Sequence, residues 1–238
     1  MSLETLEIIH DTTHVLTMPL SVVLGLWYGP KYGYSKKKAV TYSLAMMIII
    51  VLFTYACQWV PGWFGFTVFI NAARTFLFVP LFTLVLSKYW KISTLHGADF
   101  ITPIIFFVRT VVLIGCTIIG CGEAMPCEWG IFSPNSGCRV FPMDLIDLLA
   151  TFAIAIVSLI YARRLNYHGN GRIFALAMIC LGVVRSAIQL GGTDRYFGIR
   201  GLNDETIISI ISIIMGIMIY QIYENNKKIN GGLENENK

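Results

Sequence analysis

Residues 98–130 read ADFITPIIFFVRTVVLIGCTIIGCGEAMPCEWG, an apolar run that contains one arginine and ends in a cysteine-bearing loop. The run is long enough to cross a hydrocarbon core as a helix, which takes about 20 residues. Arg109 lies about ten residues, or about 15 Å, from either end of this helix. A guanidinium that keeps its proton is costly in hydrocarbon, so Arg109 is expected to face the bundle interior, a water-filled cavity or an anion.

The composition is that of an integral membrane protein. Hydrophobic residues make up 55% of the chain and charged residues 13%, whereas soluble domains carry about 25% charged residues. Backbone amides inside a bilayer need internal partners, and the sequence lacks the alternating segments of about ten residues that form a barrel. We therefore expect an all-α, polytopic membrane protein. The net charge of +4 is too small to indicate a nucleic-acid partner.

Seven apolar runs predict seven transmembrane helices, at about residues 15–30, 39–60, 66–86, 98–119, 145–161, 173–190 and 206–222. Basic residues follow every second crossing, in the segments 31–38, 88–91, 163–172 and 227–228. The positive-inside rule makes these loops and the C-terminus cytoplasmic, which leaves the N-terminus outside. The sequence thus predicts one seven-helix membrane domain over residues 1–225 and a polar, disordered cytoplasmic tail over 226–238. The opening segment lacks the features of a secretory signal, so it is expected to remain in the mature protein.

Three arginines, Arg74, Arg109 and Arg185, lie inside apolar runs, at about 9–15 Å below the outer interface. Cations at a similar depth repel one another in a low dielectric unless a negative group lies between them. Two sources of that charge stay open. One is the phosphate of an anionic lipid, which suits the planar donor fork of arginine. The other is the set of carboxylates at helix ends, namely Asp99, Asp144 and Asp147.

Four cysteines gather at or beyond the outer end of the fourth crossing: Cys116, Cys121, Cys127 and Cys138. One or two disulfides that brace the outer loop are the favoured interpretation. A zinc site is an alternative, although the spacing is not the paired CxxC form, and an activated thiol is another. His10 and His14 have the i, i+4 spacing of metal ligands, but they lack a third ligand. No metal site is therefore predicted.

Several stretches resemble the prolipoprotein diacylglyceryl transferase family. Residues 98–132, followed by VFPMDLIDLL at 140–149, are similar to its signature region, in which an aspartate opens a helix and a Gly-rich loop, a Trp-Gly and a His-Pro-x-Gln-Leu-Tyr-Glu-like segment follow. GRIFALAMICLGVVRSAIQL at 171–190 resembles the family's Tyr-Gly-x-x-Arg-x-x-x-Glu helix, and GYSKKKAVTYSLAM at 33–46 resembles its first cytoplasmic loop. The expected topology also agrees with the family.

The resemblance implies an enzyme that moves a diacylglyceryl group from an anionic phospholipid such as phosphatidylglycerol to an acceptor such as a lipobox cysteine thiol, and releases glycerol phosphate. Arg185 matches the family's essential arginine and Asp99 its helix-opening aspartate. Arg109 lies one helical turn from the position of a second key arginine. These three are the expected catalytic residues. The expected substrate-binding residues are Arg74, Asn71, Gly115, Gly120, Gln189, Asp144 and Asp147. No cofactor is expected.

Several family positions are altered. The chain has Leu113 for the second arginine, Cys116 for an asparagine, Ala72–Arg74 for a His-Gly-Gly, and Leu181, Phe141 and Gln189 for a tyrosine, a histidine and a glutamate. Two other classes therefore stay open: an inactive lipid-binding relative that serves as a subunit of a larger complex, and an outer-face thiol oxidoreductase. The expected partners are an anionic phospholipid and a lipoprotein precursor or another membrane protein, without nucleic acid. The expected location is the bacterial plasma membrane, as a multi-pass protein.

Overall fold

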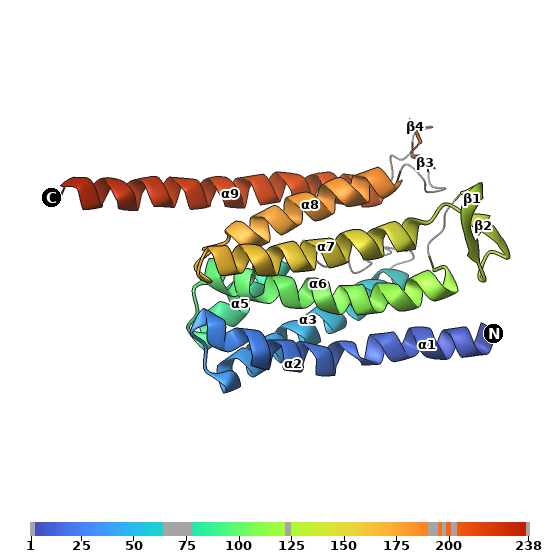
Figure 1. The fold of residues 1–238 in the computed structure, drawn as a ribbon, viewed down its shortest axis with the longest axis horizontal. Coiled ribbons are helices and arrows are strands. Elements are labelled where there is room, and N and C mark those ends of the chain that lie inside the picture. The colour runs from blue at the N-terminus through green and yellow to red at the C-terminus, as the bar shows by residue number, and fades with distance from the viewer. Residues whose placement is uncertain are drawn as a thin grey trace.

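The bundle is built around helix α6, Thr94–Ile119, most of which is buried (Figure 1). The computed structural model describes residues 3–63, 78–121, 125–189, 195–196, 199–200 and 204–236. The helices before α6 are α1 Leu3–Val15, α2 Thr17–Tyr28, the 3-10 helix η1 Gly29–Tyr32, α3 Lys36–Trp63 and α5 Val79–Trp90. The helices after it are α7 Met143–Arg164, α8 Arg172–Gln189 and α9 Asp204–Glu236.

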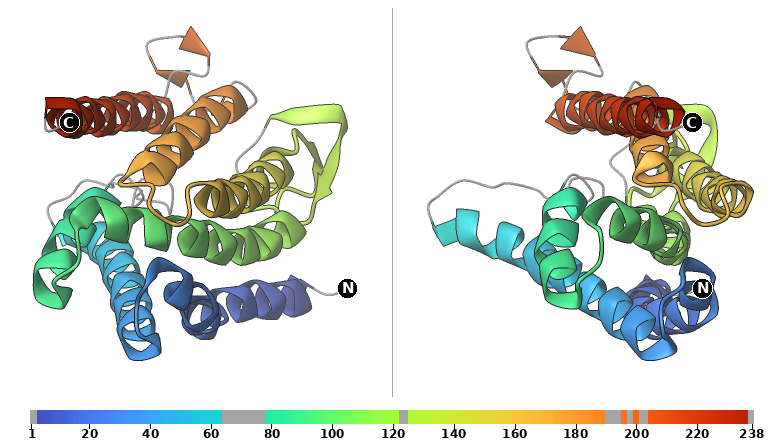
Figure 2. Two further views of the ribbon diagram at one scale, coloured as in Figure 1. Left: turned by 60° about the vertical axis from the view of Figure 1, so that its left-hand side comes forward. Right: turned by 90° about the vertical axis from the view of Figure 1, so that its left-hand side faces the viewer.

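The helices run side by side along one long axis. Helices α1 and α2 lie on one side of the bundle, α8 and α9 lie on the other, and α6 and α7 lie between them (Figures 1 and 2). Helix α6 packs against α1, α2, α5 and α7, and it also touches α3 and α8. The segment that contains Arg109 is therefore enclosed by other helices.

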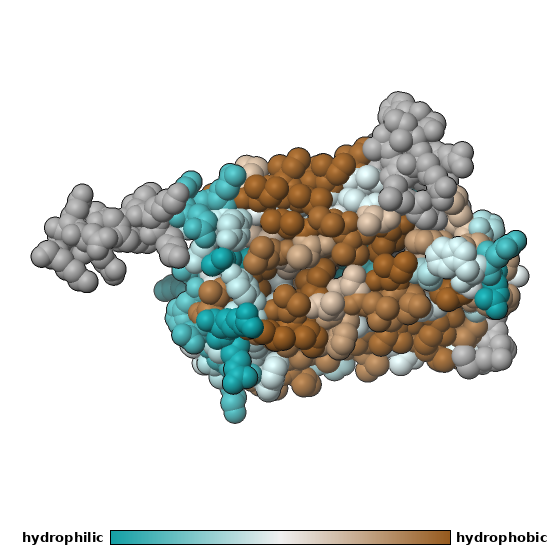
Figure 3. Space-filling view, turned by 45° about the horizontal axis from the view of Figure 1, so that its top comes forward, coloured by the Kyte–Doolittle hydropathy of each residue, from teal (hydrophilic) through white to brown (hydrophobic). Residues whose placement is uncertain are grey.

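The protein is a polytopic membrane protein. Five helical segments are long and apolar enough to cross a bilayer: Lys36–Thr54, Thr94–Ile119, Met143–Arg164, Arg172–Gln189 and Thr206–Asn225. Figure 3 shows a wide band of hydrophobic residues over the middle of one face, with hydrophilic residues gathered at the left-hand end. The predicted membrane class is confirmed, and five of the predicted crossings coincide with these candidate spans.

The basic connections lie at one end of the bundle. The α2–α3, α5–α6 and α7–α8 connections meet there, whereas the α6–α7 connection and the N-terminus lie at the opposite end (Figure 1). The sequence predicted that basic loops would share one face, and the structure confirms this grouping.

The first predicted crossing, residues 15–30, is not among these five segments, and the helical structure there begins earlier, at Leu3. Helices α1 and α2 follow one another end to end along the bundle (Figure 1). Helical hydrogen bonds continue across the junction, because the Leu16 amide donates to the Thr12 carbonyl at 3.0 Å and Leu20 to Leu16 at 3.1 Å. The third predicted crossing, residues 66–86, lies partly outside the described residues, and its described part belongs to α5.

The loop that the sequence placed at residues 120–142 contains an antiparallel hairpin. Strand β1, Pro126–Ser133, pairs with β2, Cys138–Val140. The turn SPNSG between them closes with a 2.9 Å hydrogen bond from the Gly137 amide to the Ser133 carbonyl, and Gly137 has a φ of 65°. Pro, Asn, Ser and Gly are typical of turns, so this stretch is the sequence signal that could have predicted the hairpin. A second short pair, β3 Arg195–Tyr196 and β4 Ile199–Arg200, lies between α8 and α9.

Helix α9 continues to Glu236, beyond the boundary expected at residue 225. The sequence predicted a disordered tail, and the structure has helix there, which projects past the bundle (Figure 1).

Glycines bring α8 and α9 together. A Cβ at Gly182 would lie 2.6 Å from both Ile213 Cγ1 and Ser209 O, and one at Gly216 would lie 2.8 Å from Ala175 O. Small residues at such positions let helix backbones approach within a membrane, where van der Waals packing drives association.

We predict that Gly182→Leu separates α9 from α8 and lowers the thermal midpoint of the detergent-purified protein, because the larger side chain has no space. Val183→Leu is the matched control, since Val183 is 53% exposed and a longer side chain there meets no helix. Equal midpoints for the two variants would show that the close approach is not needed.

Candidate functional site

Three charged side chains from three helices meet inside the bundle. Arg109 Nη2 of α6 donates to Asp147 Oδ2 of α7 at 2.6 Å, and Arg185 Nη1 of α8 donates to the same oxygen at 2.8 Å. Asp147 is 2% exposed and Arg109 8%. A third donor, Thr151 Oγ1, lies 3.3 Å from Asp147 Oδ1. This charged cluster, Arg109–Asp147–Arg185, joins α6, α7 and α8.

The internal-carboxylate alternative is therefore the one that the structure adopts for Arg109 and Arg185. Two guanidinium groups around one carboxylate leave a formal charge of +1. Because the ions are withdrawn from water, loss of one partner leaves an uncompensated buried charge. The cluster is thus an ionic contact that joins three helices of the membrane domain.

Asp99 lies away from this cluster, at the other end of α6. It is ten residues before Arg109, which corresponds to about 15 Å along the helix. Its Oδ2 accepts from the Gly171 amide at 2.8 Å and its Oδ1 from the Phe174 amide at 2.9 Å. A buried carboxylate thereby caps the first turn of α8 and favours its positive end. The structure does not bring Asp99 to the arginines, and its catalytic role stays a prediction.

Aromatic residues enclose the helix end that Asp99 caps. Tyr32 and Phe100 contact one another with ring centroids 5.6 Å apart, and Tyr167 lies 5.4 Å from Tyr32. The Tyr32 hydroxyl also lies 3.4 Å from the Asp99 carbonyl oxygen. Burial raises the pKa of Tyr32 and of Tyr34 well above the usual range, so both phenols stay neutral. These aromatic residues come from separate connections and from α6, so the sequence gives no local signal that they meet.

The two glycines predicted to bind substrate have packing roles. A Cβ at Gly115 would collide with Thr13 Oγ1 and lie 3.0 Å from His10 Cα, so Gly115 lets α1 approach α6. Gly120 ends α6 with a φ of 75°, and its amide donates to the Cys116 carbonyl at 2.8 Å. A positive φ at the residue after a helix favours glycine. Substrate contact by either glycine stays a prediction.

The remaining predicted residues divide into two groups. Gln189 is buried at the end of α8, one turn from Arg185, and Asp144 is half-buried in the first turn of α7. Asp144 also lines a small cavity between the end of α6 and the β1–β2 hairpin. Arg74 and Asn71 lie outside the described residues.

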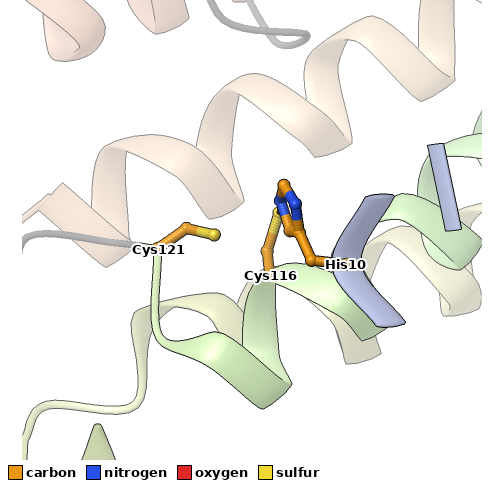
Figure 4. A group of neighbouring side chains, drawn as sticks. All are labelled: His10, Cys116 and Cys121. Carbon is orange, nitrogen blue, oxygen red and sulfur yellow. The ribbon is translucent and has the colours of Figure 1, made fainter. Parts of the chain in front are cut away.

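The outer cysteines are free thiols in the structure. Cys116, Cys121, Cys127 and Cys138 form no disulfide with one another, and their pairing stays a prediction. Cys116 and Cys121 are close enough to hydrogen-bond, and this contact lowers the pKa of the Cys121 thiol. His10 lies beside them (Figure 4). The sequence could not reveal this group, because α1 and the end of α6 are about 100 residues apart in the chain.

The part of the chain that contains the charged cluster matches a known protein family. The family model for prolipoprotein diacylglyceryl transferase matches residues 75–222, well over half of the sequence. The chain belongs to this family. The match contains all three members of the charged cluster, together with Asp99.

A curated relative agrees with the family match. The chain is similar to the phosphatidylglycerol–prolipoprotein diacylglyceryl transferase of Clostridium tetani (strain Massachusetts / E88), with 27% identity over 143 residues. The match covers 57% of this chain and 55% of the relative. The chain thus spans about half the length of the curated relative that it matches.

We predict that Asp147→Asn destabilises this family member by about 3–5 kcal/mol, because it leaves two buried arginines around a neutral amide. Thermal unfolding in detergent would measure the loss. In the double variant Asp147→Asn/Arg109→Gln one of those cations is also removed, so it should regain part of the lost stability. Additive losses in the two single variants and the double variant would contradict a coupled buried cluster.

Proposed function

We propose that this protein transfers a diacylglyceryl group from an anionic phospholipid to a thiol acceptor in the bacterial plasma membrane. Phosphatidylglycerol is the proposed donor, and the cysteine of a lipoprotein precursor is the proposed acceptor. The observation that carries the proposal is the buried, positively charged cluster inside the region of the family match. The relative's name states the same donor and acceptor for that protein.

The charge of the cluster supports a phosphate ligand. Its two guanidinium groups supply positive charge for a phosphodiester anion. Arginine presents five N–H donors in a planar fork that suits phosphate oxygens. Within the low dielectric of the bundle such donors stabilise negative charge more strongly than they would in water.

The proposed reaction is a displacement at a glyceryl carbon. The acceptor sulfur forms a C–S bond to that carbon while its C–O bond to the phosphate breaks. The bonding electrons leave with the phosphate oxygen, and the thiol proton passes to solvent or to the departing glycerol phosphate. Arg109 and Arg185 would hold the phosphate and stabilise the charge that develops on it.

Asp99 would act as a positioning residue in this scheme. It caps the first turn of α8 through the Gly171 and Phe174 amides. Arg185 lies further along that helix, so a shift of the α8 N-terminus changes where the guanidinium lies. The family-based assignment of Asp99 to the site is then explained without contact with the lipid.

The proposed orientation places the N-terminus outside and the C-terminus in the cytoplasm. The basic connections gather at one end of the bundle (Figure 1), and the positive-inside rule makes that end cytoplasmic. The chain would then cross the bilayer seven times, with α1 and α2 as the first crossing. The charged cluster would lie in the outer half of the membrane.

The decisive experiment places the purified protein in phosphatidylglycerol vesicles with a lipobox peptide. We expect a peptide mass increase of one diacylglyceryl group in thioether linkage and release of glycerol phosphate. Arg185→Gln and Arg109→Gln should each lower the rate about 100-fold or more, as loss of a charge-stabilising donor does. Arg164→Gln is the control, because Arg164 is exposed at the end of α7.

Each variant must first be shown to be folded by gel filtration and thermal unfolding. A folded wild-type protein that forms no thioether product would exclude transfer to this acceptor. If phosphatidylglycerol still co-purifies and the arginine variants lose it, the protein is a lipid-binding relative without turnover.

A further inference from the structure

We propose that His10, Cys116 and Cys121 form a zinc-binding site that joins α1 to the end of α6. The site lies at the end of the bundle opposite the basic connections (Figures 1 and 4). It is independent of the proposed transferase activity, since none of its ligands belongs to the charged cluster.

The three ligand atoms converge on one point. His10 Nε2 and Cys116 Sγ are 3.9 Å apart, and the ligand atoms of all three residues lie within 4.8 Å of one another. Tetrahedral zinc, with bonds of about 2.0–2.1 Å to nitrogen and about 2.3 Å to sulfur, places N and S about 3.5 Å apart. The His10–Cys116 pair therefore needs to close by only a few tenths of an ångström.

We place His14 of α1 as the fourth ligand. The His10 and His14 rings have centroids 4.7 Å apart, and His14 lies one helical turn after His10. His14 is exposed, so its ring can turn toward the site. Two imidazoles and two thiolates make the Cys₂His₂ set that zinc takes in closed structural sites.

The orientation of His10 fits a metal ligand. Its Nδ1 lies 3.2 Å from Asp11 Oδ1, while its Nε2 points toward Cys116. Ligating histidines commonly donate their second ring N–H to a carboxylate, which fixes the tautomer and the ring orientation. Asp11 can supply that support here.

The backbone also brings the ligands together. Gly115 lets α1 approach α6 beside Cys116, because a Cβ there would meet Thr13 and lie 3.0 Å from His10 Cα. Gly120 turns the chain at the end of α6, and the Cys121 amide then donates to the Cys116 carbonyl at 3.2 Å. This turn of the chain places the Cys116 and Cys121 sulfurs beside the last turn of α6.

The ligand chemistry selects the metal. Thiolate and imidazole together favour zinc over magnesium or calcium, which prefer oxygen ligands. The bound ion would clasp α1 to α6, so the stability of the protein would depend on zinc.

The test uses the full-length, tag-free protein, purified in detergent under argon with a non-chelating reductant. Zinc per chain is measured by elemental mass spectrometry, and Zn²⁺ affinity by competition with a chelator. We expect one zinc per chain and a higher thermal midpoint with zinc than after chelation. Cobalt(II) in place of zinc should give sulfur-to-metal charge-transfer absorption.

Ligand variants locate the site. Cys116→Ser, Cys121→Ser and His10→Gln should each weaken Zn²⁺ binding about 100-fold or more, and Asp11→Ala about tenfold. Cys180→Ser is the matched control, since it removes an exposed thiol from α8 and should leave binding unchanged. In the wild type, zinc should protect Cys116 and Cys121, but not Cys180, from alkylation, a readout that does not require the variants to fold.

Three results would each overturn the proposal. They are the absence of saturable zinc binding by the reduced wild type, undiminished binding by the double variant Cys116→Ser/Cys121→Ser, and a Cys116–Cys121 disulfide in protein taken directly from cells.

Discussion

One carboxylate connects the interior of this membrane domain. Asp147 accepts from Arg109 of α6 and from Arg185 of α8, so that three helices share a single buried ionic contact. In hydrocarbon neither arginine could stay charged without a partner at low cost. The packing of α6, α7 and α8 therefore has to keep these groups within hydrogen-bonding distance. The same requirement places two arginine side chains where the proposed reaction needs hydrogen-bond donors.

The two ends of α6 serve different purposes. At one end Asp99 caps α8 from inside a layer of buried aromatic side chains, which fixes the helix that carries Arg185. At the other end Gly115 and Gly120 allow α1 and the β1–β2 hairpin to approach closely. Most of α6 between them is buried, in contrast to α9, whose exposed isoleucines form a lipid-facing surface. The helix thus joins a cap, a charged cluster and the histidine–cysteine group on one rigid element.

Family membership and geometry contribute different parts of the functional argument. The family match identifies a class of transferase, and the relative's name states a donor and an acceptor for that protein. The geometry supplies the charge and burial of the residues that would hold a phosphate. It also separates Asp99 from them and shows that Asp99 caps α8, while its catalytic role stays a prediction.

The sequence alone determined the membrane class, five of the candidate crossings, the grouping of basic loops and the need of Arg109 and Arg185 for a negative partner. Hydropathy and the cost of buried charge are properties of single segments, which is why they can be read from the sequence. It also named Asp147 among the carboxylates that could neutralise them. Only the tertiary structure decided that Asp147 serves both arginines while Asp99 does not, since that depends on which helix faces meet. The same holds for His10, which helix packing brings to Cys116 and Cys121 across about 100 residues of intervening chain. The β1–β2 hairpin was not predicted from the sequence. Its turn residues are equally typical of a loop between two helices, which is the structure that was expected there.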